Sequence, residues 1–363
     1  MPFSAKKIFP RKTGNPFRIL ITFAFWNFLE GMMRRLLLVF IGFLFIGSPL
    51  YGQRKEIFRA FEDSIIHLHH EILNERNAVL RYQKNEKLLK QVEDALKLRN
   101  SINYGFDSVR TISILTSPDK KVRIVTWFLI AESGTHEHFG FVQAYSSEAG
   151  HYVVYPLTDC WQRIINPSTQ VLTPETWFGA LYTQIIQTKD DDKTYYTLLG
   201  WNGGNLFSQY RVIEVLTIQH DKPVFGANIF RNYAKRTMRV VFQFAPVGRL
   251  NLSYEKQSIA QKPEKKRKKN NNKKNENPGP DTLQVQMIIF DRLVPMDEHL
   301  QKLPQYYVGE SSLNDAFIQQ HGKWYFRPDV IGRNPDKSYP AYERKPHTDY
   351  KPVKKQPAPK TQP

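Results

Sequence analysis

The chain has 363 residues, 41% of them hydrophobic and 13% aromatic, so it can bury a real core and wholesale disorder is excluded. Its one cysteine, Cys160, excludes an intramolecular disulfide and a thiolate-clustered metal site within one chain. The net charge of +18 divides into +6 over residues 1–52, +6 over 261–280 and +5 over 331–363. The body of the chain is therefore nearly neutral, which argues against specific nucleic-acid binding by a folded basic face.

The N-terminal region has the layout of an export signal. Met32-Met33-Arg34-Arg35 supplies a positive start, Leu36–Ile46 is an apolar run, and Gly47–Gly52 breaks the helix. This order is typical of a secretory signal peptide over residues 32–52, with cleavage near Gly52. We therefore expect an exported protein that is periplasmic or associated with the outer envelope.

Residues 1–31 precede this signal and contain a shorter apolar run. A signal peptide normally starts close to its positive region, so residues 1–31 are interpreted as an upstream extension, and Met1, Met32 and Met33 stay open as the start. The alternative is an uncleaved anchor in the inner membrane that uses both apolar runs. No later stretch is long and apolar enough for a membrane-spanning helix, so we expect no transmembrane span in the mature chain.

Residues 53–101 have a helical pattern. A first apolar stripe recurs every three or four residues and consists of Ile57, Phe61, Ile65, Leu68 and Ile72. A second stripe follows after Asn74 and Asn77, which weaken the helix, and consists of Leu88, Val92, Ala95 and Leu96. The pattern predicts two antiparallel helices, or one bent helix, packed against the region that follows.

Residues 104–330 show short strands separated by polar turns. Val122–Ile130 and His138–Tyr145 predict a first hairpin, followed by a strand at His151–Tyr155. Tyr195–Trp201 and Tyr210–Ile218 predict a second hairpin, because the Asn-Gly-Gly sequence between them supplies the positive φ angles of a tight turn. Further strands are expected at 223–229, 238–244, 250–254, 285–290 and 323–326, whereas 181–186 fits a helix or a strand.

These elements predict an α+β fold. The N-terminal helical segment is expected to pack on a mainly antiparallel β domain, built as a sandwich or an open barrel.

Two polar segments cannot contribute to a core. Residues 258–282 lie between two expected strands and are interpreted as a disordered basic hairpin loop, and residues 331–363 as a disordered tail rich in Pro and Lys. The loop is expected to contact anionic envelope surfaces, together with the tail, through Lys265, Lys266, Arg267, Lys268, Lys269, Lys273 and Lys274.

Several segments together resemble a family of uncharacterised secreted proteins of Bacteroidota-type Gram-negative bacteria. They are Ser117-Pro118-Asp119, Val122–Trp127, Tyr195–Gly203 and Ile289–Pro295. The resemblance covers roughly residues 60–330. It implies an exported protein of that lineage and implies no activity.

Histidine pairs are the first candidates for chemistry. His67 and His70 lie three residues apart on the first expected helix, and His136 and His138 lie two apart on an expected strand. Both spacings can place two imidazoles on one face, but neither pair has a third ligand. A surface role for the first pair and a solvated hairpin tip for the second are favoured. No metal and no cofactor are predicted.

Three other motifs are better explained by structure than by chemistry. Asp190-Asp191-Asp192 lacks the alternating spacing and the glycine of a calcium loop. Gly200–Gly204 resembles a phosphate-binding glycine loop, but a strand follows it instead of the helix whose N-terminus would hold the phosphate. Cys160 with His151 suggests a thiol nucleophile, but a lone thiol in an exported β protein is more often a small buried apolar residue. We therefore name no catalytic residue.

Two sets of residues remain as candidates for a site. Asp291 follows an apolar strand and is the acid to inspect for a hydrolase whose carboxylates meet only in the fold. Four tryptophans lie in or beside strands and can stack on a ligand if one sheet face exposes them: Trp127, Trp177, Trp201 and Trp324. For Trp127 and Trp201 a place in the core is favoured.

Three functions follow from these patterns. The favoured one is a non-enzymatic, envelope-associated accessory factor. The alternatives are an envelope hydrolase, which requires two acids about 5–10 Å apart in a concave pocket, and a carbohydrate- or peptide-binding module, which requires coplanar exposed aromatic side chains.

Overall fold

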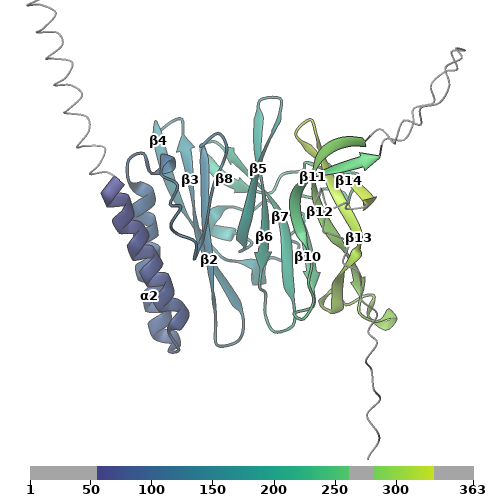
Figure 1. The fold of residues 1–363 in the computed structure, drawn as a ribbon, viewed down its shortest axis with the longest axis horizontal. Helices are drawn as coiled ribbons and strands as arrows, with labels where there is room; N and C mark the ends of the chain where they lie inside the picture. Colours follow the sequence, from purple (N-terminus) through teal and green to yellow (C-terminus); the bar gives the residue numbers. More distant parts are fainter. Residues whose placement is uncertain (1–54, 261–281, 331–363) are drawn as a thin grey trace, which may run out of the picture.

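The computed structural model describes residues 55–260 and 282–330, which form a helical layer followed by three stacked antiparallel sheets (Figure 1). This arrangement confirms the predicted α+β class. In the described part of the chain none of the sheets closes into a barrel. The upstream extension, the signal peptide, the basic residues from Lys265 to Lys274 and the tail lie outside the described residues. Among the residues described, no helix is long and apolar enough to cross a membrane.

The helical segment is a pair of helices. α1 covers residues 55–74 and α2 covers Ala78–Lys97. Asn77 caps α2, because its side chain accepts a hydrogen bond from the Leu80 amide at 3.1 Å. The polar residues between the two stripes therefore end one helix and begin the next, as the sequence predicts for the two-helix alternative.

The buried face of α1 differs from the expected stripe at its start. Phe58 is buried and Ile57 is exposed, and the polar Glu62 lies on the buried face. Glu62 is held there because it accepts hydrogen bonds from the Tyr104 hydroxyl at 2.7 Å and from the Ser108 amide. The pattern misplaced Ile57 because periodicity cannot anticipate a buried carboxylate with its own donors. The second stripe is confirmed, with Leu88 and Val92 among its buried residues.

The first sheet has the order β1-β2-β3-β4. Its strands are Ser113–Thr116, Val122–Ile130, His136–Ser146 and His151–Thr158. The helices pack on one of its faces, where Val125, Trp127 and Phe141 join residues of both helices in one core cluster. β2 and β3 form the first predicted hairpin.

The second sheet has the order β10-β7-β6-β5, and β8 pairs with β7. Its strands are β5 (Leu181–Asp190), β6 (Lys193–Asn202), β7 (Gln209–Gln219), β8 (Lys222–Phe225) and β10 (Val240–Phe244). β6 and β7 form the second predicted hairpin, and the ambiguous segment at 181–186 is strand. This sheet packs against the first through a core that includes Trp177, Tyr182 and Leu198.

The third sheet has the order β11-β12-β13-β14-β9. Its strands are β11 (Leu252–Ala260), β12 (Thr282–Pro295), β13 (Tyr307–Gln320), β14 (Lys323–Val330) and the short β9 (Phe230–Arg231), which is parallel to β14. Ala260 pairs with Thr282, so the basic insertion connects two paired strands. Trp324 and Phe317 are part of the core between this sheet and the second.

Five 3-10 turns complete the described elements. They lie at Ser101–Asn103, Trp161–Arg163, Pro174–Thr176, Glu298–Leu300 and Pro304–Tyr306.

A buried polar contact joins α2 to the first sheet and gives a first testable prediction. The indole nitrogen of Trp127 donates a hydrogen bond to Asn85 Oδ1 at 2.7 Å, and both side chains are buried. Trp127→Phe leaves the Asn85 amide without a partner, so we expect the free energy of unfolding to fall by about 2–4 kcal/mol in urea denaturation. Asn85→Leu combined with Trp127→Phe should recover part of that loss. Equal stability of the single and double variants would contradict this account.

Candidate functional site

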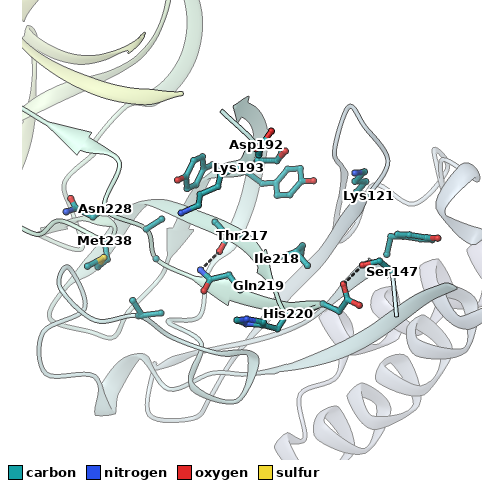
Figure 2. Close-up of a pocket in the computed structure, with 18 residues that line it drawn as sticks. Lys121, Ser147, Asp192, Lys193, Thr217, Ile218, Gln219, His220, Asn228 and Met238 are labelled. Atoms are coloured by element: carbon teal, nitrogen blue, oxygen red, sulfur yellow. Dashed lines mark hydrogen bonds between the residues drawn. The ribbon is translucent and has the colours of Figure 1, made fainter. Parts of the chain in front are cut away.

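A cavity of about 700 Å³, which we call the tyrosine-lined cavity, lies among the described residues (Figure 2). It lies where turns of the first and second sheets meet. Lys121 and Ser147 line it from the first sheet, and Lys193, Thr217 and Gln219 line it from β6 and β7. This volume lies in the range of binding sites for small molecules.

The β7–β8 turn closes one side of the cavity. His220 and Asp221 both have positive φ angles, 48° and 61°, which a two-residue hairpin turn requires. The Asp221 carboxylate accepts hydrogen bonds from the Glu148 amide at 2.8 Å, from Ser147 Oγ at 2.8 Å and from Ser146 Oγ at 3.0 Å. These donors lower the pKa of Asp221 to about 2, with the Glu148 amide the largest cause. Asp221 therefore ties the first sheet to the second and stays ionised.

Polar side chains form the interior of the cavity. Gln219 donates a hydrogen bond to Thr217 Oγ1 at 3.0 Å. Figure 2 shows the Lys193 side chain extending toward these two residues, whereas Asp192 points away and Lys121 lies on the other side. In the described ranges neither lysine forms an ion pair. The cavity therefore offers two available ammonium groups.

Tyrosines supply the aromatic surface of the same cavity, from both sheets. Tyr145 stacks edge-on with Tyr152 at a centroid distance of 5.4 Å. Tyr195 and Tyr196 line the cavity beside Lys193. Burial raises the pKa of Tyr196, and its hydroxyl donates to Asp119 at 2.9 Å. The raised pKa values keep Tyr195 and Tyr196 neutral at physiological pH, and the tyrosine rings can contact a ligand through their faces or hydroxyl groups.

Three of the four candidate tryptophans are core residues. Trp127, Trp177 and Trp324 are buried, each in a different core cluster, and so present no shared face to a ligand. Their indole nitrogens are used internally: Trp177 donates to the Tyr182 hydroxyl and Trp324 to Thr197 Oγ1, both at 2.9 Å.

Trp201 is half-buried at the end of β6. Its indole nitrogen donates to Gln209 Oε1 at 2.8 Å, and its ring meets Phe128 and His136 edge-on. The tryptophans therefore do not form the coplanar exposed platform that a sugar- or peptide-binding sheet face requires. The aromatic surface of the tyrosine-lined cavity is formed by tyrosines and contains none of these tryptophans.

Asp291 lies in a second, polar cavity of about 430 Å³ on the third sheet. It is buried, and its Oδ2 accepts hydrogen bonds from the Asn251 amide at 2.8 Å and from Asn251 Nδ2 at 2.9 Å. Glu255 lines the same cavity, where its Oε1 accepts a hydrogen bond from Ser253 Oγ at 3.3 Å. The two hydrogen bonds from Asn251 indicate a structural role for Asp291, because they hold the β11 end of the chain to β12.

The interpretation of His136 and His138 as a solvated hairpin tip is wrong. His138 is buried, and its Nδ1 lies 2.8 Å from Asp159 Oδ2, which also accepts from the His138 amide. Burial lowers the pKa of His136, whose ring packs between Phe128 and Trp201. The tip interpretation failed because the β6–β7 loop covers His136: the Gly204 carbonyl accepts a hydrogen bond from its amide at 2.8 Å. The described residues contain no group of three or more side chains suited to a metal ion.

The remaining motifs have structural positions. Cys160 is buried and its thiol accepts from Arg163 at 3.0 Å, whereas His151 lies at the opposite end of β4, so the two do not meet. Asp190 pairs with Lys323 at 3.1 Å beside the β5–β6 turn. His67 is exposed and lies 3.7 Å from Glu71.

Sequence reasoning did not identify the residues of the tyrosine-lined cavity. Lys193, Thr217 and Gln219 match no motif, and exposed Lys and Thr are ordinary residues of strand ends. The pairing of β6 with β7 and the packing of the first sheet on the second bring them together. Comparisons of the chain with protein-family models, with curated proteins and with solved structures found no match, so the interpretation of this site rests on its own geometry.

Proposed function

We propose that this protein is a non-enzymatic, exported accessory factor that holds a polar ligand in the tyrosine-lined cavity. The observation that carries the proposal is the composition of that cavity. It combines tyrosines, amide and hydroxyl groups and two unpaired ammonium groups in a volume that suits a small ligand, and its carboxylate Asp192 points away from Lys193 in Figure 2. Its acid at the β7–β8 turn, Asp221, is fully engaged in holding two sheets together.

The chemistry of the cavity favours a ligand with a negative charge. Lys193 and Lys121 can pair with a carboxylate, and the tyrosines can contact sugar rings or peptide groups. A uronic-acid oligosaccharide or a short peptide with a free carboxylate fits this description. Export rests on the sequence of residues 32–52, and contact with anionic envelope surfaces rests on the basic insertion and tail. Both remain part of the proposal.

Ligand-induced stabilisation tests the cavity. We expect a glucuronic-acid oligosaccharide or an acetylated dipeptide with a free carboxylate, at ten times its Kd, to stabilise the protein by about 1.4 kcal/mol. The neutral N-acetylglucosamine oligomer of matched length should do so less. Lys193→Gln removes the ammonium group and should abolish the rise in Tm produced by the charged probe.

The matched control is Lys189→Gln, which removes a lysine on the neighbouring strand β5 outside the cavity lining. It should bind the charged probe as the unmodified protein does. The proposal is overturned if neither charged probe raises Tm, or if Lys193→Gln and Lys189→Gln respond equally.

A further inference from the structure

Exposed apolar side chains gather on the loops at one end of the second and third sheets. They come from three separate connections: β6–β7, β10–β11 and β12–β13. Their exposed fractions range from 41% to 83%, and together they form what we call the apolar ridge: Leu206, Phe207, Val247, Met296, Leu303 and Tyr306.

Hydrogen bonds order the turn that carries Leu206 and Phe207, the outermost residues of the ridge. Asn205 Oδ1 accepts from the Phe207 amide at 2.9 Å and from the Ser208 amide at 3.2 Å, and the Asn205 amide donates to the Ser208 carbonyl. The amides of Asn205, Phe207 and Ser208 are thus satisfied within the turn. Leu206 and Phe207 project from it with exposed fractions of 69% and 75%. Their exposure is therefore a property of an ordered turn.

Further bonds tie the three connections together. Gln209 Nε2 donates to the carbonyls of Ala245 and Gly248, at 3.2 and 3.1 Å, which holds the β10–β11 turn beside the β6–β7 loop. The Ala245 amide donates to the Tyr307 carbonyl at 2.8 Å, which joins that turn to the start of β13. The Met296 amide donates to the Tyr306 carbonyl at 3.0 Å. The three connections that carry the ridge are therefore held beside one another by hydrogen bonds.

The tip of the helical layer lies at the same end of the molecule. The Tyr82 hydroxyl donates to Glu137 Oε2 at 2.7 Å, which places the start of α2 beside the start of β3. Leu73, Val79 and Leu80 are exposed at this helical tip. In Figure 1 the helical tip and the three loops face the same way, along the lower edge. With layers spaced about 10 Å apart, the exposed apolar side chains span roughly 30 Å.

We infer that this end of the protein inserts into the interface of a lipid bilayer. Single exposed apolar residues are ordinary, but a braced row of them on convex tips marks an interaction site. Separate convex tips spread over about 30 Å suit a broad, deformable apolar acceptor, because a rigid protein partner would need a matching pit for each tip. The inference extends the proposed envelope association and does not depend on the ligand cavity.

The charges beside the ridge predict which lipids are needed. Exposed Arg249 and Lys302 are balanced by exposed Asp297 and Glu298. Insertion should therefore proceed on neutral phosphatidylcholine and depend little on salt. Attachment through the basic insertion would require anionic lipid and would weaken as salt rises.

A fluorescent probe at a single site distinguishes insertion of the ridge from attachment of the full chain to vesicles through another segment. With Cys160 replaced by serine, we would label Phe207→Cys with an environment-sensitive fluorophore and add phosphatidylcholine vesicles that carry brominated lipid. We expect emission from position 207 to rise and to be quenched by the brominated chains. The matched control is Leu313→Cys, which is exposed to 40% in β13, six residues from the Tyr307 end of that strand and so about 20 Å along it from the ridge. Its fluorophore should not respond.

Partition between water and vesicles measures how much the apolar side chains of the ridge contribute to membrane binding. Leu206→Ser combined with Phe207→Ser should weaken partition into phosphatidylcholine vesicles at least tenfold relative to Ile57→Ser combined with Leu313→Ser, which removes exposed apolar side chains outside the ridge and the cavity. The inference is overturned if position 207 responds no more than position 313, an outcome that would indicate a protein partner. It is also overturned if vesicles are bound only with phosphatidylglycerol present and only while residues 262–274 are retained. Neither outcome changes the Lys193→Gln test of the ligand cavity.

Discussion

Arg239→Met is expected to lower the free energy of unfolding by about 3–5 kcal/mol at pH 7. Arg239 is fully buried, and its Nε donates to Glu214 Oε2 at 2.7 Å. Its other nitrogens donate to the carbonyls of Pro167, Gln170 and Phe225. The substitution leaves a buried carboxylate without its cation and removes the donor of the Pro167 and Gln170 carbonyls, whereas the Phe225 carbonyl still accepts from the Leu172 amide. Urea denaturation at constant pH measures the loss.

The pH dependence of that loss identifies Glu214 as its cause. Burial raises the pKa of Glu214 even with Arg239 beside it, which opposes the shift. A carboxyl whose folded pKa is raised stabilises the fold most below its unfolded pKa and loses that contribution as pH rises. Without Arg239 the pKa of Glu214 should rise further. The loss in free energy of unfolding caused by Arg239→Met should therefore become smaller as the pH falls from 7 to 5, by up to about 1.4 kcal/mol per pH unit.

A double variant is the control for the ion pair. Glu214→Leu combined with Arg239→Met removes both charges and should recover much of the stability, with a weaker pH dependence. If the double variant is as unstable as Arg239→Met at pH 7, the unpaired carboxylate is not the source of the loss.

Arg123→Met should destabilise the attachment of the helical layer by about 3–4 kcal/mol. Arg123 is buried in β2 and donates to the carbonyls of Ser101 and Ile102, at 2.8 and 3.0 Å, and to that of Tyr104. Its guanidinium also lies 5.2 Å from the ring centroid of Phe106. Burial lowers its pKa to about 10, so it remains charged at pH 7. Replacement removes the donor of the Ile102 and Tyr104 carbonyls in the connection between α2 and β1, whereas the Ser101 carbonyl still accepts from the Tyr104 amide.

Hydrogen exchange locates that effect. Amides of residues 98–106 should exchange faster in Arg123→Met, while those of the third sheet should change only as much as global stability requires. Arg110→Met replaces an exposed arginine in the same connection and should leave both exchange and stability close to those of the unmodified protein. Similar behaviour of the two variants would refute the specific role of Arg123.

The local patterns of this sequence predicted much of the secondary structure. Alternating β-branched and aromatic residues gave the β2–β3 hairpin, and Asn202-Gly203-Gly204 marked the β6–β7 loop, where Gly204 has a φ of 60°. Such features depend on neighbours in sequence, so they can be recognised without the fold.

The hydrophobic pattern of the sequence gave wrong predictions where residues are buried by segments that are distant in the sequence. β13, Tyr307–Gln320, is central in the third sheet, but its sequence pattern is polar, because Gly309-Glu310-Ser311-Ser312 lies in the half that pairs with the half-buried end of β12. The expected start of the α1 stripe failed for a related reason: a carboxylate with its own donors is buried there, and the apolar Ile57 is not.

What the sequence determined by itself is the α+β class, most strands, the helical N-terminal segment and the uneven distribution of charge, since each depends on local composition or periodicity. Only the tertiary structure decided which groups meet. It placed Lys193 over Thr217, enclosed Asp291 with Asn251, buried three tryptophans in separate cores and aligned apolar tips from loops about 100 residues apart. These outcomes depend on the packing of whole layers, and no local pattern encodes the distance between residues on different sheets.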